Sequence, residues 1–125
     1  MTENDISYKV RNAIFKLYNE LGPGLFESVY EQALLYQLKK DGLNSRSQVE
    51  VPVYYDQQKL YIGFRIDVLV EDLVIIEIKS VEEISKVHHK QLLTYLKLTE
   101  IRLGLLVNFN TNNIAESIIR KVNGL

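Results

Sequence analysis

The sequence predicts an α/β fold in which helices cover a central sheet. Two segments with helical spacing of apolar residues precede residue 41, three strand-like segments follow up to residue 80, and a helical segment then leads into another apolar run. The predicted order is α-α-β-β-β-α-β-α, which is typical of a layered α/β domain. The 125 residues fit a single domain, 1–125, large enough to fold without disulfides.

The first two predicted elements are amphipathic helices with a break between them. Apolar residues recur at helical spacing over residues 6–21 and again from residue 26 to about residue 40. The intervening sequence GPG, residues 22–24, cannot continue a helix. The alternative of a phosphate-binding loop is weaker, because the sequence lacks the Lys and Ser/Thr of a P-loop.

Three predicted strands follow as a meander. SQVEVPVYYD (47–56) and KLYIGFRIDVLV (59–70) alternate apolar and polar residues around a polar turn, DQQ. LVIIEIKS (73–80) is a β-branched apolar run of the kind found in a central strand. Because Glu71 and Asp72 form a short polar break, we expect the second and third strands to be antiparallel.

The last third of the chain predicts a helix, a strand and a second helix. EEISKVHHKQLLTYLKLTE (82–100) is expected to form a long helix, and IRLGLLVNF (101–109) a buried strand. NIAESIIRKV (113–122) is expected to close the chain as a short helix capped by Asn113. The stripe expected on one face of the long helix contains Ile84, Val87, His88, Gln91, Tyr95 and Leu98, and Leu92 and Leu96 widen it.

Composition excludes several classes of site. The chain has no cysteine, which removes disulfides, thiolate metal sites and cysteine nucleophiles. Neither a signal peptide nor a membrane-spanning run is visible, so we expect a soluble cytoplasmic protein without a membrane partner. The net charge of −1 counts against a nucleic-acid partner, although local Lys and Arg residues can still contact phosphates.

Three charged residues interrupt the apolar strands. Glu77 and Lys79 lie two apart in a strand and so share a face, and the turn at residues 71–72 would bring Asp67 roughly opposite Glu77. Facing carboxylates repel each other unless one is protonated or a hard cation lies between them. Mg²⁺ suits such a pair, because it takes oxygen ligands and leaves positions open for a phosphate.

These residues resemble a known family. Asp67 followed by Glu77-Ile78-Lys79 is similar to the metal-binding signature of the PD-(D/E)XK nuclease superfamily, and Gln91 and Tyr95 resemble the QxxxY element of one of its branches. LGPGLFESVYEQAL, with Gly22, Glu27 and Tyr30, resembles the pattern that names the GxxExxY family, a small branch of that superfamily. The resemblance extends from about residue 6 to residue 110. One residue differs from the pattern in the superfamily's name: Ile66 precedes Asp67, where the pattern has a proline.

The resemblance implies an αβββαβ core, with a mixed central sheet flanked by helices, and a Mg²⁺ or Mn²⁺ cofactor. It implies that Asp67, Glu77, the backbone carbonyl of Ile78 and Glu27 bind the metal. Lys79 would act on the attacking water or the scissile phosphate. The residues that would position the substrate are Gln91, Tyr95, His88 and Tyr30.

Each residue also has a purely structural interpretation. Glu27 could be an ordinary acid in the first turn of a helix, and Glu77 and Lys79 could form an ion-pair network at a sheet edge. Asp67 could pair with Arg65. Gln91 and Tyr95 could face solvent, and His88 and His89 could be surface histidines, because neighbours on a helix point in different directions.

The leading functional hypothesis is a divalent-metal-dependent nuclease that hydrolyses phosphodiester bonds of nucleic acid, with DNA as the first expectation. A homodimer is also expected, because a domain of this size needs a second copy to cut both strands of a duplex. Two alternatives remain open: a binding module that keeps the fold without cleavage, and a metal hydrolase acting on small phosphodiesters.

Overall fold

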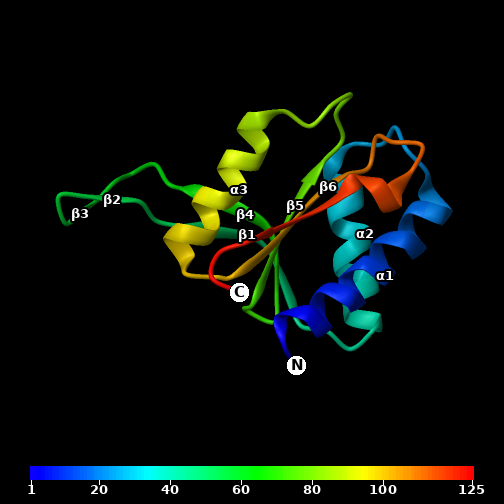
Figure 1. Ribbon diagram of the computed structural model, residues 1–125, viewed down its shortest axis with the longest axis horizontal. Coiled ribbons are helices and arrows are strands. Elements are labelled where there is room, and N and C mark those ends of the chain that lie inside the picture. Colours follow the sequence, from blue (N-terminus) through cyan, green and yellow to red (C-terminus); the bar gives the residue numbers. More distant parts are fainter.

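The computed structural model describes residues 1–125 as a mixed sheet with helices on both faces (Figure 1). The fold class expected from the sequence is confirmed. In chain order the elements are α1 (Glu3–Leu21), α2 (Glu27–Lys40), β1 (Ser45–Val51), β2 (Tyr54–Tyr55), β3 (Gln58–Lys59), β4 (Phe64–Val70), β5 (Val74–Lys79), α3 (Lys86–Thr99), β6 (Leu103–Asn108), η1 (Ile114–Ser117) and β7 (Ile118–Val122).

The main sheet has five strands in the order β1-β4-β5-β6-β7. Neighbouring strands are antiparallel except β5 and β6, which are parallel and are connected through α3. The expected meander is confirmed, since β4 pairs with both β1 and β5. Glu71 and Asp72 make the turn between β4 and β5 with positive φ angles of 53° and 56°.

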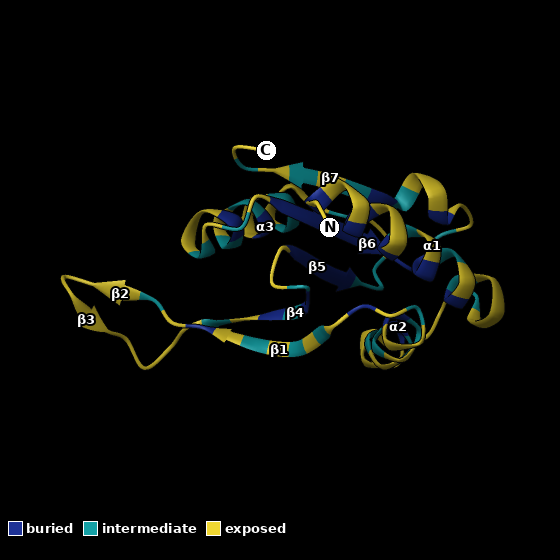
Figure 2. Ribbon diagram, turned by 90° about the horizontal axis from the view of Figure 1, so that it is seen from below, coloured by how far each residue is buried: buried dark blue, intermediate teal, exposed yellow.

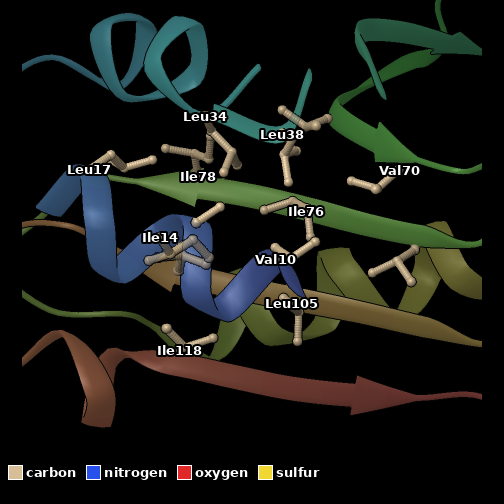
Figure 3. Close-up of a cluster of buried hydrophobic side chains, with 14 of the residues drawn as sticks. Val10, Ile14, Leu17, Leu34, Leu38, Val70, Ile76, Ile78, Leu105 and Ile118 are labelled. Atoms are coloured by element: carbon tan, nitrogen blue, oxygen red, sulfur yellow. The ribbon is translucent and has the colours of Figure 1, made fainter. Parts of the chain in front are cut away.

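The core lies on both faces of the sheet. On one face, α1 and α2 pack their apolar stripes against β4, β5 and β6, and Figure 3 shows Leu34 of α2 beside Ile78 and Val10 of α1 beside Ile76. On the other face, Leu92 and Leu96 of α3 pack in a smaller cluster. None of the helices is both long enough and apolar enough to cross a membrane.

The predicted stripe of α3 is confirmed only in part. The helix begins at Lys86, and Val87 and Leu98 of the stripe are 59% and 52% exposed. Leu92 and Leu96, which were expected only to widen the stripe, are fully buried and form its centre. The reason lies in β6, where Gly104 leaves room for Leu92: a Cβ at Gly104 would lie 2.7 Å from Cδ1 of Leu92. This close approach sets which face of α3 meets the sheet.

The predicted C-terminal helix is also wrong beyond its first turn. Asn113 does cap a 3₁₀ helix, since its side chain accepts a hydrogen bond from the backbone N–H of Glu116. From Ile118 the chain forms β7 and pairs with β6. The β-branched residues Ile118, Ile119 and Val122 favour a strand, and β7 covers an edge of β6 that would otherwise expose its backbone.

Candidate active site

Asp67 and Glu77 meet where β4 and β5 separate. The ladder between these strands runs from Val70 and Val74 to Val68 and Ile76. At the next position the backbone N–H of Asp67 donates to Oε1 of Glu77 at 3.3 Å. The backbone N–H of Ile78 donates to Oδ2 of Asp67 at 2.8 Å. The expectation that the hairpin would place the two acids opposite each other is therefore confirmed.

Glu77 is buried in the middle of the sheet, with 6% of its surface exposed. Burial, and next the charge of Asp67, raise the pKa of Glu77 to about 9. The ammonium of Lys79 lowers that pKa, but it is the smallest of the contributions. At neutral pH the pair of acids therefore holds a proton, because a buried carboxylate beside a second carboxylate does not ionise readily without a compensating cation.

Asp67 also marks a break in the side-chain alternation of β4. Ile66 packs in the cluster under α3, whereas Val68, two residues later, packs in the cluster under α1 and α2. Residues two apart in a regular strand lie on the same face. The strand therefore turns over at Asp67, which allows this residue both to contact Glu77 and to line a pocket beside α2.

The pocket beside α2 is small, about 220 Å³, and mostly polar. Glu27, the first residue of α2, lines it with Asp67 and Ile78. Oε2 of Glu27 accepts a hydrogen bond of 2.8 Å from the backbone N–H of Ser80, just after β5. The hydroxyl of Ser80 donates to the carbonyl of Leu25, also at 2.8 Å. These bonds fix the start of α2 against the end of β5.

Three further residues of this pocket were not predicted from the sequence: Gln48 of β1, and Ser28 and Glu31 of α2. Nε2 of Gln48 donates to Oε1 of Glu31 at 2.9 Å. Gln48 has a φ of 51°, in the left-handed region, and the register of β1 places it opposite Asp67, where neither residue joins the ladder. The spacing of Glu27 and Glu31, one helical turn apart, was a signal for Glu31. No sequence pattern marks Gln48.

The structure excludes two of the alternative interpretations. β5 is the third strand of five, so Glu77 and Lys79 are not at a sheet edge. Lys79 takes part in none of the ion pairs of the chain. Arg65 pairs with Glu50 at 3.9 Å rather than with Asp67. The acids and Lys79 thus form no pair that would explain their presence by folding alone.

Tyr95 of α3 lies close enough to the two acids to feel their charges. Gln91 and His88, the other predicted substrate-positioning residues of α3, have different surroundings. Burial, followed by the charges of Glu77 and Asp67, raises the pKa of Tyr95. Its ring stacks on Phe64, with centroids 4.1 Å apart. Gln91, one turn earlier, is exposed. Nδ1 of His88 accepts a hydrogen bond from the backbone N–H of Ser85 and so caps α3.

His89 and Tyr30 have structural surroundings away from the acids. Burial lowers the pKa of His89, whose Nδ1 has no hydrogen-bond partner. Tyr30 is fully buried and stacks on Phe109. Its hydroxyl donates to the carbonyl of Gly22 at 2.6 Å and accepts from the N–H of Leu25 at 3.2 Å. Tyr30 therefore secures the loop before Glu27 from within the core.

The donor set fits a hard divalent cation only in part. Two adjacent carboxylates offer the oxygen ligands that Mg²⁺ and Mn²⁺ prefer, and an ion there would replace the proton that Glu77 retains. Nowhere does the chain gather three or more His, Asp or Glu side chains in a group able to hold a metal. Glu27 therefore shares a pocket with Asp67 without completing a cluster of three acids.

Comparisons with known proteins identify the family and a similar fold. The sequence model of the PD-(D/E)XK nuclease superfamily matches residues 4–121. Among solved structures, the chain is similar to the crystal structure of SSO0001, with 25% identity and a TM-score of 0.59. That match covers 79% of this chain and 51% of the other, so this chain spans about half its length. A search of curated proteins gives no match.

Proposed function

Because the chain belongs to the PD-(D/E)XK nuclease superfamily, we propose that it hydrolyses phosphodiester bonds of nucleic acid with the help of a divalent metal ion. The observation that carries the proposal is the contact between Asp67 and Glu77 at the point where β4 and β5 separate. Folding gives no reason to place an acid as buried as Glu77 against the half-buried Asp67, because its ionised form would lose its hydration in the sheet.

Asp67 and Glu77, with the backbone carbonyl of Ile78, would hold Mg²⁺ or Mn²⁺. When bound, the ion would lower the pKa of a water molecule and polarise the scissile phosphate. Glu77 would release its proton to solvent and offer its carboxylate to the ion, and Asp67 would keep the orientation that the N–H of Ile78 imposes. The N–H of Asp67 in turn orients Glu77.

The remaining residues would position the substrate. Lys79, unpaired at the end of β5, would neutralise charge developing on the phosphate or orient the attacking water. The hydroxyl of Tyr95 would donate a hydrogen bond to a phosphate oxygen. Gln91, exposed one turn earlier, would contact the nucleotide. In the pocket beside Asp67, Glu27 in the first turn of α2 and Gln48 in β1 would both orient a water molecule.

Three finer assignments accompany this proposal. The GxxExxY branch is proposed because the spacing G-x-x-E-x-x-Y fits from Gly24 through Glu27 to Tyr30, so the glycine of the motif is Gly24 rather than Gly22. DNA is proposed as the substrate, and a homodimer as the form that cuts both strands of a duplex. Light scattering and a comparison of labelled DNA and RNA test these two assignments.

The decisive experiment is calorimetric titration of Mn²⁺ into the metal-free wild type, Asp67→Asn, Glu77→Gln and the control Glu50→Gln, whose carboxylate lies on the exposed face of β1. The wild type and the control should bind, and the other two should not. Cleavage of labelled single- and double-stranded DNA and RNA should follow the same pattern. Equal binding by all four proteins would exclude the proposed metal site.

A second candidate is a nucleic-acid-binding module that does not cleave. The absence of a third carboxylate beside Asp67 and Glu77 favours it. This candidate predicts binding that is insensitive both to EDTA and to Glu77→Gln, together with no cleavage of any substrate in Mn²⁺. Cleavage by the wild type that Glu77→Gln abolishes would eliminate it.

A further inference from the structure

A two-stranded hairpin extends away from the rest of the protein (Figure 2). We name residues 52–63, which contain β2 and β3, the arm. Its large side chains are unusually exposed: 61% for Tyr54, 75% for Tyr55, 107% for Tyr61 and 81% for Ile62. Clusters of exposed apolar side chains in water are typical of binding surfaces. We propose that the arm binds unpaired nucleotides of the substrate and that its tyrosine rings stack on their bases.

One face of the arm carries both groups that a nucleotide requires. Tyr54 pairs with Lys59 across the hairpin, so the ring and the ammonium project from the same face. A base can stack on an aromatic ring, and a neighbouring cation can bind the phosphate of the same nucleotide. The charges of Asp56 and Lys59 cancel within the arm, so stacking rather than attraction to phosphate dominates binding there.

The arm is continuous with the proposed active site. It prolongs β1 and β4, the strands that carry Gln48 and Asp67. Phe64, at the base of the arm, stacks on Tyr95, whose hydroxyl is close enough to the acids for their charges to raise its pKa. Gly63 and Asp67 are about 13 Å apart along the strand, at roughly 3.3 Å per residue. A nucleic-acid strand leaving the acids therefore reaches the arm within a few nucleotides.

A groove lies at the base of the arm, where the arm joins β1 and β4. Its volume is about 570 Å³, and its apolar wall consists of Val51, Leu60, Tyr61, Ile62 and Phe64. Arg65 and Lys59 stand among the polar residues of the same groove. A flat base can lie against the wall while its phosphate meets Lys59, because Arg65 already pairs with Glu50 of the same groove.

The chemistry of stacking restricts the substrate class. Bases within a duplex stack on one another and present only their edges, whereas unpaired bases offer their faces to aromatic side chains. The arm therefore favours single-stranded nucleic acid, or single-stranded ends and flaps, over continuous duplex. This inference rests on the proposed function and specifies the form of nucleic acid that the same site would receive.

The test measures binding without cleavage. Fluorescence anisotropy in EDTA follows a labelled oligothymidylate and a labelled mixed-sequence duplex. The proteins are the wild type, Tyr54→Ala/Tyr61→Ala, Tyr54→Phe/Tyr61→Phe and Tyr8→Ala. Tyr8 is a matched control, because it is 69% exposed on α1, far from the arm in sequence. Thermal unfolding of each variant verifies that the fold is intact.

We expect the wild type to prefer the oligothymidylate and the alanine double variant to bind it at least about tenfold more weakly, because two stacking rings are lost. The phenylalanine double variant and Tyr8→Ala should bind like the wild type. Equal binding by the wild type and the alanine variant, or a preference for duplex, would overturn the inference and leave the proposed metal site untouched, since Mn²⁺ titration tests that site separately.

A second copy of the chain is the other partner that could cover the arm. Light scattering on the same proteins separates the two cases. A wild-type dimer that becomes monomeric in the alanine double variant, with unchanged oligothymidylate binding, would assign the arm to self-association and overturn the inference. An unchanged mass together with weakened binding would support it.

Discussion

Asp67 and Glu77 replace the backbone ladder between β4 and β5 with hydrogen bonds from backbone to side chain. The N–H of Asp67 donates to Glu77 at 3.3 Å, and the N–H of Ile78 donates to Asp67 at 2.8 Å. The two acids thus hold the strands together at a point where the ionisation of both would be unfavourable. Replacing the ionisable group of Glu77 by an amide should therefore raise the stability of the protein and abolish its proposed activity.

Glu77→Gln should stabilise the metal-free protein. With a pKa of about 9 when folded and 4.5 when unfolded, Glu77 favours unfolding at pH 7 by an amount on the order of 3 kcal/mol, which is an upper bound for the gain. Glutamine keeps the shape and the acceptor oxygen. Urea unfolding in EDTA measures the change, with Glu50→Gln as a control expected to change stability by less than about 0.5 kcal/mol. A less stable Glu77→Gln variant would contradict this assignment of the unfavourable charge.

The metal-free protein should lose stability as the pH rises. Glu77 binds a proton more tightly in the folded protein than in the unfolded chain, so its contribution is fully present below pH 4.5 and is lost progressively up to about pH 9. The slope should approach about 1.4 kcal/mol per pH unit. Urea unfolding at several pH values within this window gives the slope. Glu77→Gln should flatten it, and an identical slope in that variant would assign the titration to another group.

Metal binding at neutral pH should release a proton. Glu77 must lose its proton before its carboxylate can coordinate, and its pKa of about 9 keeps it protonated at pH 7. Calorimetric titration of Mn²⁺ in buffers with different ionisation enthalpies counts the protons released. We expect a number near one. A heat of binding that is the same in every buffer would mean that Glu77 is already ionised or does not bind the metal.

The sequence predicted the centre of the fold better than its edges. The short turn at Glu71 and Asp72 fixes the register of β4 and β5, so the position of Asp67 opposite Glu77 followed from the place of the turn. The segment after Asn113 was ambiguous, because a short apolar run fits either a helix or a strand. The unpaired edge of β6 decided it in favour of β7. Edge pairing is a tertiary effect that local periodicity does not record.

The residues of the candidate site that are charged and lie in apolar strands were predicted from the sequence. Those whose position depends on an unusual backbone conformation were not. Asp67, Glu77 and Lys79 were visible as charged residues in buried segments. Tyr30 was expected to contact substrate, but the structure buries it against Phe109. Gln48 lies in an ordinary alternating segment, and its left-handed φ arises only because β1 and β4 both leave their regular pairing opposite Asp67.

Tyr30→Phe should destabilise the protein by about 1–2 kcal/mol. The substitution keeps the stacking on Phe109 and removes the hydroxyl that bonds the carbonyl of Gly22 and the N–H of Leu25. Urea unfolding measures this loss, with the exposed Tyr36, at 70%, as the matched control in Tyr36→Phe. A direct role in binding substrate predicts the reverse: unchanged stability with weaker oligonucleotide binding.

Gln48 offers a test that separates backbone strain from side-chain function. Its φ of 51° costs a residue with a Cβ about 1–2 kcal/mol, and glycine escapes this cost. Gln48→Gly should therefore be more stable than Gln48→Ala by about 1 kcal/mol, whereas at Ser47, which pairs regularly with Val68, alanine should be the more stable of the two. Both Gln48 variants lose the amide that bonds Glu31, so both should cleave more slowly with unchanged Mn²⁺ affinity. Wild-type cleavage rates in both variants would limit Gln48 to shaping the strand.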